Sequence, residues 1–494
     1  MSNSQVPLPT QVRPSPSVQQ MQARPVVKRT LIHRKPPTKV QLNQALFAEA
    51  YRRNTKLVAR LLAQGADPNT RDKTGTPVIF YAAAVKDNAP VITLLLSKGA
   101  IVNARDQHGN TPLTEAVQLG NGSLAALLLQ HKADPNVRNG AGFTPLGIAV
   151  AKNDMPAIKL LLIHGADPNT AQRGGLTPLV LAVGRGNPQA VRLLIDAGAT
   201  INPGAKSSIP PLSVAVATLH QAPGSAVREA VLLELLDHKA DANVRDAQGN
   251  PPLLVSVSLG NLVGARLLLE HGAQGDAPDR LGRSPLMLAA GQGRLDLVRL
   301  LLTSGAAPSC RDKQGFSPLL WAVRYNHTDI ARALLQAGAL PDSATDHGLT
   351  PLLAACWKGN AVLARMLLDK GASVRAADKQ GNTPLMLAAH SGNVPLVALL
   401  LGRGADVSAR TAQGATALSY ASGHKAVLAL LLPRLAKQSK PAVPSLPLVP
   451  LVPMVTPGAL PSPPSAMPTP SAAHLPTGPL VPGADAMPHV PGQP

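Results

Sequence analysis

One short motif returns along the chain at a nearly constant interval, and this interval constrains the fold more than any other feature. The motif is Thr-Pro-Leu or a close variant, and eight of the ten intervals between successive copies are 33 residues. Such a periodicity predicts similar units stacked one on the next, instead of a single globular core. The copies begin at Thr76, Thr111, Thr144, Thr177, Pro210, Pro251, Ser284, Ser317, Thr350, Thr383 and Thr416.

Each copy of the motif predicts the start of a helix. A Ser or Thr hydroxyl can accept a hydrogen bond from a free N–H group of the first turn, and Pro fits the first helical position because it lacks the N–H that would have no partner there. Nine residues after most copies stands Gly or Asn, which adopt positive φ most readily and so predict the end of a short helix. These residues are Gly120, Asn153, Gly186, Gly260, Gly293, Asn326, Gly359 and Gly392.

A second helix is predicted in the remainder of each unit. In one unit, residues 297–302 place apolar side chains on one face of a helix, ahead of the pair Gly305 and Ala306. The polar residues 312–315 then precede the next motif and are typical of an exposed loop or short hairpin. Each unit is therefore expected to hold two short helices and one exposed loop.

Two helices and a loop, opened by Thr-Pro-Leu and closed by Gly-Ala, resemble the ankyrin repeat, and the resemblance covers about Thr38 to Ala436. It implies an all-α, ankyrin-type helix-turn-helix solenoid of about 12 repeats. The family usually has His directly after Thr-Pro-Leu, whereas this chain has mostly apolar residues there, and we expect them to make hydrophobic contact between neighbouring units. They are Thr114, Gly147, Val180, Ser213, Leu254, Met287, Leu320, Leu353, Met386 and Ser419.

The sequence divides into three segments. Residues 38–436 form the predicted array, and a capping-box pattern of Thr38 with Gln41 marks its first helix. Residues 1–37 are basic and rich in Pro, Gln and Ser, while residues 437–494 are rich in Pro. Both outer segments hold too little apolar surface to form a packed core, so we expect two disordered arms.

Prolines in the C-terminal segment recur at every third position from Pro441 to Pro453. This spacing favours polyproline II, which has three residues per turn. The run 441–453 is therefore either a ligand for a Pro-recognition module or part of a spacer. The absence of Arg and Lys inside the run favours the spacer.

Two units depart from the regular pattern. The interval from Pro210 to Pro251 is 41 residues, which predicts a loop insertion near 221–226, between the two helices of that unit. Because the unit also lacks a capping hydroxyl, we expect it to be the weakest part of the array. The last unit, from Thr416, has Ala417 in place of Pro and is expected to close the array as a C-terminal cap.

No catalytic or cofactor-binding pattern occurs in the sequence. It contains no Gly-Lys-Ser/Thr phosphate loop, no His-Glu-x-x-His, no Gly-x-Ser-x-Gly and no Cys-x-x-Cys. We therefore expect a protein that is not an enzyme and that binds no cofactor or metal. Four histidines near the ends of second helices could be interpreted as a metal ladder, but a polar group at a helix C-terminus is the favoured interpretation. They are His131, His164, His238 and His271.

Arg-Asp dipeptides also recur at matching places in the loops. Carboxylates at such solvated positions are interpreted as loop-ordering groups and not as active-site acids. The pairs are Arg71-Asp72, Arg105-Asp106, Arg245-Asp246 and Arg311-Asp312.

The chain has 47 Lys and Arg against 27 Asp and Glu, a formal net charge of +20. This charge favours nucleic-acid or anionic-surface binding as one alternative. The basic N-terminal arm has no acidic residue, which also fits a host-directed bacterial effector. The sequence begins without a signal-peptide core, it has no transmembrane segment, and Cys310 and Cys356 fall in different units. We expect a cytoplasmic protein, with secretion by a non-classical or effector route as the alternative.

The remaining expectation concerns a binding surface. Partners of ankyrin repeats usually dock on the loop tips and on the concave face formed by first helices, so the resemblance implies a non-enzymatic scaffold that binds proteins there. Basic tips suggest a partner with an acidic patch, and aromatic residues would anchor it. Trp321 and Trp357 have an alternative role in packing between units. The candidate residues are Lys73, His108, Phe143, Arg173, Lys206, Arg280, Arg283, Lys313, Phe316, Trp321, Arg324, Tyr325, Trp357 and Lys379.

Overall fold

The part of the chain that the computed structural model describes consists of residues 37–172, 174–204, 209–221 and 225–438. These residues form 24 α-helices and no β-strand, in twelve consecutive pairs. The all-α array of about twelve units is thereby confirmed. It begins at Thr38, whose side chain forms the predicted capping box with Gln41, and its last helix ends at Gln438. The two arms lie almost wholly outside the described residues.

The first helix of each pair is mostly seven residues long, and the second is mostly nine. The first helices are α1 (Lys39–Tyr51), α3 (Val78–Ala83), α5 (Pro112–Gln118), α7 (Pro145–Ala151), α9 (Pro178–Arg185), α11 (Pro211–Gln221), α13 (Pro252–Ser258), α15 (Pro285–Gly291), α17 (Pro318–Arg324), α19 (Pro351–Trp357), α21 (Pro384–His390) and α23 (Ala417–Tyr420). The second helices are α2 (Thr55–Ala63), α4 (Ala89–Ser97), α6 (Gly122–Gln130), α8 (Met155–Ile163), α10 (Pro188–Asp196), α12 (Ala226–Asp237), α14 (Leu262–Glu270), α16 (Leu295–Thr303), α18 (Thr328–Gln336), α20 (Ala361–Asp369), α22 (Val394–Gly402) and α24 (Lys425–Gln438).

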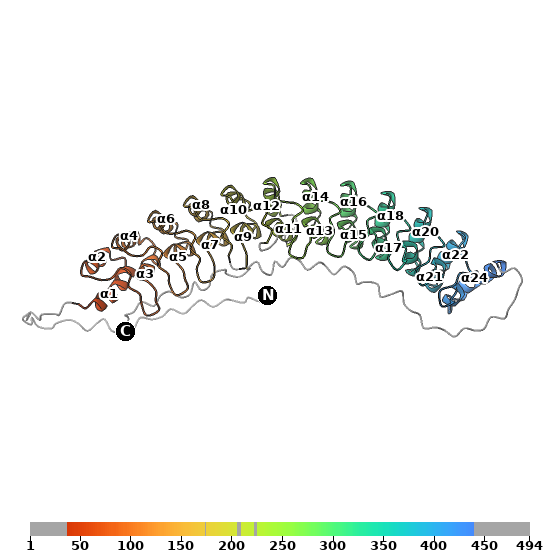
Figure 1. The fold of residues 1–494 in the computed structure, drawn as a ribbon, viewed down its shortest axis with the longest axis horizontal. Helices are drawn as coiled ribbons and strands as arrows, with labels where there is room; N and C mark the ends of the chain where they lie inside the picture. The colour runs from red at the N-terminus through yellow and green to blue at the C-terminus, as the bar shows by residue number, and fades with distance from the viewer. Residues whose placement is uncertain (1–36, 173, 205–208, 222–224, 439–494) are drawn as a thin grey trace, which may run out of the picture.

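The pairs stack into a long arch (Figure 1). First helices lie on its inner, concave side, and second helices lie on its outer, convex side. Each first helix contacts the first helices of the units before and after it, as α17 contacts α15 and α19. The inner surface is therefore a continuous layer of short helices.

Most first helices begin and end as the sequence predicts. The Thr144 hydroxyl accepts a hydrogen bond from the Gly147 N–H at 3.1 Å, and Ser317 accepts one from Leu320 at 3.2 Å. The Gly or Asn predicted to end these helices has positive φ in all eight cases, including 66° at Asn326. Both ends of the first helix are thus set by local residues.

The motif at Thr76 is an exception, and the cap expected there is wrong. Pro77 stands at the N-cap of α3 and offers no side-chain acceptor. The loop before it explains the displacement, because Asp72 accepts the N–H groups of Thr74 and Thr76, each at 2.8 Å. These bonds hold Thr76 within the loop, so the helix starts one residue later.

The long interval after Pro210 is taken up mainly by helix, which corrects the expected loop insertion. The helices of this unit, α11 and α12, have 11 and 12 residues, against seven and nine in α13 and α14. Residues 222–224 between them lie outside the described part of the chain. Added helical turns pair their own backbone N–H and C=O groups, which a loop of the same length would leave to water or side chains.

Apolar side chains from both helices form one core that runs through the array. The position that usually holds His contributes to it, since Met287 and Leu320 are at most 1 % exposed. Gly147, at the same position of its unit, leaves room for the side chain of Gln172 from the next loop. A Cβ at Gly147 would overlap that side chain. Apolar contact at this position is therefore confirmed for the replacements that carry large side chains.

Candidate functional site

In most loops a polar side chain accepts backbone N–H groups of the same loop; it is usually Asp, and Asn139, Thr345 and Thr411 take this place in other loops. The Asp246 carboxylate accepts the backbone N–H groups of Gln248 and Asn250 at 2.9 and 2.8 Å. Arg245 beside it donates to the Pro278 carbonyl of the next loop at 2.8 Å. The Arg-Asp dipeptides are confirmed as loop-ordering residues, although each side chain acts on backbone groups and not on its neighbour.

Backbone hydrogen bonds hold the loop tips of the C-terminal half in register. The Lys313 N–H donates to the Leu281 carbonyl at 3.1 Å, and the Lys379 N–H donates to the His347 carbonyl at 3.0 Å. Successive tips therefore stand side by side. The exposed side chains of Arg280, Lys313 and Lys379 lie along one edge of the array.

The other predicted loop residues fall into three groups. Lys73 and His108 are exposed at the tips of earlier loops. Phe143 is half-buried and packs against the core. Arg173 and Lys206 lie outside the described residues.

Arg283 is engaged within its own loop. Its Nε donates to Asp279 Oδ2 at 2.7 Å, and Asp279 is buried. Arg280 differs, because its exposed side chain donates a single bond, to the Ala247 carbonyl at 3.0 Å. Of these two arginines, Arg280 is the one whose side chain is exposed to solvent.

Three aromatic rings surround Arg324; they come from the loop before α17, from α17 itself and from its C-cap residue Tyr325. The centroids of Phe316 and Trp321 are 5.5 Å apart, and Trp321 stacks on Tyr325 at 5.7 Å. The guanidinium carbon of Arg324 is 5.6 to 5.8 Å from all three centroids, which is within cation–π range. Burial raises the pKa of Tyr325, which makes ionisation of its phenol still less favourable.

The burial of this cluster corrects the expectation of exposed anchors. Phe316, Trp321 and Arg324 are 6, 5 and 8 % exposed. The reason lies one unit earlier, where Gly291 has no side chain and a Cβ would stand 3.3 Å from the Trp321 ring. Trp321 fills this space, so it is a packing residue between α15 and α17.

Trp357, at the end of α19, stays partly exposed. The ammonium group of Lys358 lies 5.0 Å from the centroid of its ring. A hollow of about 650 Å³ is lined by Lys358, Arg324 and Tyr325 together with the turns at Asn326 and 359–361. Sequence reasoning missed Lys358, although its position directly after an expected anchor could have indicated it.

The chemistry of this hollow suits binding and not turnover. Arg324 and Lys358 supply two positive charges, and its lining includes no Asp or Glu. It also includes no Ser, Cys or His that could act as a nucleophile or base. A smaller cavity of about 30 Å³ adjoins it, so that an apolar wall and one carboxylate lie next to the two positive charges. Its lining residues are Arg324, Lys358, Asp378, Leu349, Ala354, Trp357 and Leu387.

The four aligned histidines end second helices, as favoured from the sequence. They are the C-cap residues of α6, α8, α12 and α14. Nδ1 of His164 and of His271 lies 2.9 and 2.8 Å from the carbonyl oxygen four residues earlier. Among the described residues, no group of three or more His, Cys, Asp or Glu could hold a metal ion.

Cys310 and Cys356 are both free thiols. Burial raises the pKa of each, because a thiolate is poorly stabilised away from water. Both thiols are therefore harder to ionise than a free cysteine, and Cys356 is a buried packing residue. None of the helices in the described ranges is long and apolar enough to cross a membrane.

Comparison with known proteins agrees with this architecture. A family model of ankyrin repeats in three copies matches residues 46–139, 132–205, 219–312 and 292–378. A second model, of ankyrin repeats in many copies, matches residues 367–421. The matches together cover more than half of the chain. No curated protein matches the sequence at a significant level.

Proposed function

The chain belongs to the ankyrin repeat family, and from this premise we propose that it is a non-enzymatic scaffold that binds a partner protein through its concave face and loop tips. A fold alone does not determine a function, so the proposal depends on the inner surface. The observation that carries it is the pair of Trp357 and Lys358, an aromatic ring and a cation placed beside the hollow at Arg324.

The rigidity of the surface supports a binding role. Stacked first helices and loop tips joined by backbone bonds leave few groups to be ordered when a partner binds. A preformed surface therefore loses little conformational entropy on association. This is how an array without catalytic groups can bind specifically.

The charges support a partner with an acidic patch. Arg280, Lys313 and Lys379 lie along the loop edge, and Lys358 stands in the hollow. Charges at the edge of an interface mainly speed association, while a central aromatic residue such as Trp357 mainly slows dissociation. Recognition would thus begin at the tips and be completed on the inner face.

Nucleic acid or another anionic surface is the alternative ligand, and the net charge of +20 supports it. Against it, no recognition-helix motif is present and the basic residues are spread over many units. The acid-free N-terminal segment supports a host-directed bacterial effector, and the free thiols support a cytoplasmic location. A Pro-recognition module remains a proposed ligand for 441–453.

Affinity capture from a native lysate with the full-length protein identifies the partner, and binding kinetics then test the surface. Arg280→Glu with Lys313→Glu should slow association in a salt-dependent manner. Trp357→Ala should speed dissociation by a factor that corresponds to about 1–2 kcal/mol. Lys56→Glu, an exposed residue on α2, is the matched charge control and should change neither rate.

Two results would contradict the proposal. Unchanged kinetics in the tip and Trp357 variants would mean that the partner binds elsewhere. Duplex DNA that competes with the partner, with an affinity that falls steeply as salt rises, would favour the nucleic-acid alternative.

A further inference from the structure

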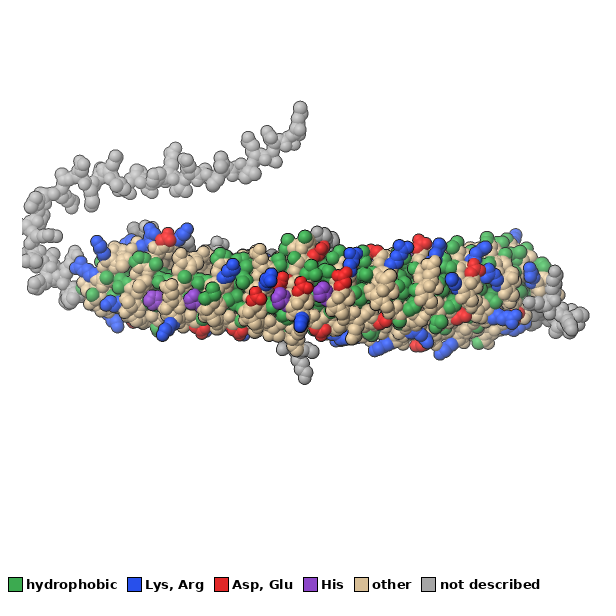
Figure 2. All heavy atoms as spheres, turned by 90° about the horizontal axis from the view of Figure 1, so that it is seen from above, with side chains coloured by type: hydrophobic (Ala, Val, Ile, Leu, Met, Phe, Trp, Pro, Cys, Tyr) green, Lys and Arg blue, Asp and Glu red, His purple; other side chains and the backbone are tan. Residues whose placement is uncertain are grey.

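A row of arginines follows the outer face of the array, on the side opposite the concave surface. Arg266, Arg299, Arg332 and Arg365 occupy the same position in four consecutive second helices, and all four are exposed. Figure 2 shows this outer face, on which basic side chains recur along the C-terminal half. The concave binding site proposed above makes no use of these residues.

Most of this positive charge is not neutralised within the protein. Asp369, which stands near the row, is already paired with Arg403 at 2.6 Å. Among the described ion pairs, Arg332 has one long contact, 4.0 Å to Asp329, and the other three arginines have none. The row therefore presents guanidinium groups to solvent at one site per unit.

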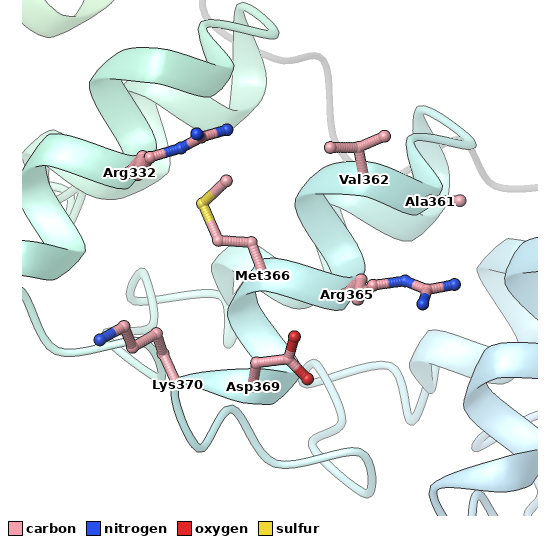
Figure 3. Close-up of a pocket in the computed structure, with 7 residues that line it drawn as sticks. All are labelled: Arg332, Ala361, Val362, Arg365, Met366, Asp369 and Lys370. Atoms are coloured by element: carbon pink, nitrogen blue, oxygen red, sulfur yellow. The ribbon is translucent and has the colours of Figure 1, made fainter.

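A pocket of about 480 Å³ opens within the row, between α18 and α20 (Figure 3). Arg332 extends toward it from α18, while Met366 points into the gap from α20. Val362 beside them is 61 % exposed, and the rest of the lining consists of Ala361, Arg365, Asp369 and Lys370, so that one carboxylate lies among three basic side chains. Apolar surface and positive charge thus adjoin at one place on the outer face.

We propose that this row binds an acidic amphipathic α-helix of a partner protein, laid across α16, α18 and α20. Adjacent packed helices are about 8–10 Å apart. Seven residues of an α-helix rise about 10.5 Å. A helix with an acidic residue at every seventh position therefore meets Arg299, Arg332 and Arg365 in turn.

An extended strand does not fit the same spacing. Side chains on one face of a strand repeat at about 6.6 Å, so successive carboxylates fall between the arginines and not opposite them. The helix also brings an apolar side chain of the same face to the pocket at Val362 and Met366. Because the outer face curves away from a straight helix, contact is limited to these three units.

The test uses the full-length protein and a labelled synthetic helix. The probe is a capped, alanine-based peptide of about 21 residues, with Glu at every seventh position and one Leu placed for the pocket. Fluorescence anisotropy should show salt-sensitive binding, and Arg332→Glu with Arg365→Glu should weaken it at least tenfold. Val362→Asp should weaken it as well, because it puts a carboxylate at the apolar wall.

Two controls keep the test specific to this face. Lys159→Glu changes the equivalent exposed position of α8, in a unit distant from the pocket, and should leave binding unchanged. Trp357→Ala alters the concave site and should also leave peptide binding unchanged. The proposal for the outer face can therefore fail or succeed independently of the proposal for the concave face. All substituted side chains of the row are exposed, and circular dichroism checks that the variants fold.

Three outcomes would overturn the inference. The first is a peptide with Lys in place of Glu that binds equally well. The second is wild-type affinity in the Arg332→Glu, Arg365→Glu protein. The third is duplex DNA that displaces the peptide at a salt concentration of about 0.15 M, because the row would then be a phosphate-binding surface.

Discussion

The side-chain amide of Asn136 donates a hydrogen bond to the Gly165 carbonyl in the next unit, at 3.1 Å. Its oxygen accepts the N–H of Asp167 in the same turn, at 2.7 Å. One amide thereby joins two units through both its donor and its acceptor. The same pair of bonds is made by Asn69, Asn169, Asn202 and Asn243.

These paired Asn bonds form a ladder between units. In two C-terminal units an Asp takes the place of the Asn, and the ladder there keeps the accepted bond but loses the donated one. Asp276 accepts the Ala307 N–H at 3.0 Å, and Asp342 accepts the Ser373 N–H at 2.9 Å. An ionised carboxylate has no hydrogen to donate, so the carbonyl that an Asn would bind is left to water. At this position, neighbouring C-terminal units therefore share fewer side-chain hydrogen bonds than units in the N-terminal half, although backbone bonds between loop tips also join the C-terminal units.

Asn136→Asp should lower the free energy of unfolding by about 0.5–1.5 kcal/mol, because it keeps the acceptor of the ladder and removes the donor. Asp276→Asn is the matched reverse change and should raise it, since the new amide can donate to Gly305. Urea denaturation followed by circular dichroism measures both. Shifts in the same direction would show that the donor half of the ladder has no role.

Trp321→Ala should lower the free energy of unfolding by about 3–5 kcal/mol, because it leaves a cavity against Gly291 at the contact of two units. Trp357→Ala removes the same residue type from a partly exposed position and should cost clearly less. Urea denaturation of the two variants checks the difference. Equal losses would mean that Trp321 does not fill the contact as described.

The contrast between Asn326 and Trp321 shows what the sequence could predict. The positive φ of Asn326 follows from a rule that acts within one unit, and the structure confirms it. The burial of Trp321 depends on Gly291, a residue 30 positions earlier, whose role appears only when two units are stacked. Most helix ends were therefore predictable, whereas the exposure of inner-face residues was not.

The candidate site was only partly predictable for the same reason. Trp357 could be proposed as an anchor by residue type, and its ion–ring contact with Lys358 joins two consecutive residues, but the hollow beside Arg324 arises only when two units are stacked. The structure of the extra residues between Pro210 and Pro251 was also not predictable from the sequence. Their number reveals an insertion, but not that it lengthens α11 and α12.

The unit that begins at Pro210 should open first within the array. Its Ser213 hydroxyl is buried and has no hydrogen-bond partner among the described residues. Such a group lowers stability by about 1–3 kcal/mol, so Ser213→Ala should slow hydrogen exchange in α11 and α12. Ser256→Ala is the control, since the buried Ser256 hydroxyl donates to the Asn261 carbonyl at 2.9 Å and its loss should destabilise. Uniform protection across the central units would contradict this weak point.

The stability of the protein should depend on pH through Glu115, which lies on α5, the first helix of its unit. Burial raises the pKa of its carboxyl group, and repulsion from Asp106 adds to the effect. A carboxyl whose pKa is higher in the folded state binds its proton more tightly there, so the ionised form destabilises the fold at neutral pH. Glu115→Gln should therefore raise the melting temperature at pH 7.

Because the pKa of Glu115 is raised in the folded state, the stability gain from Glu115→Gln should depend on pH. The gain from Glu115→Gln should shrink as the pH falls through the raised pKa, and it should vanish below the usual value of 4.5, where Glu115 is protonated in both states. Melting curves of both proteins between pH 4 and about pH 8 measure the difference. An equal gain at every pH would assign it to side-chain packing, since a shape change acts on stability independently of protonation.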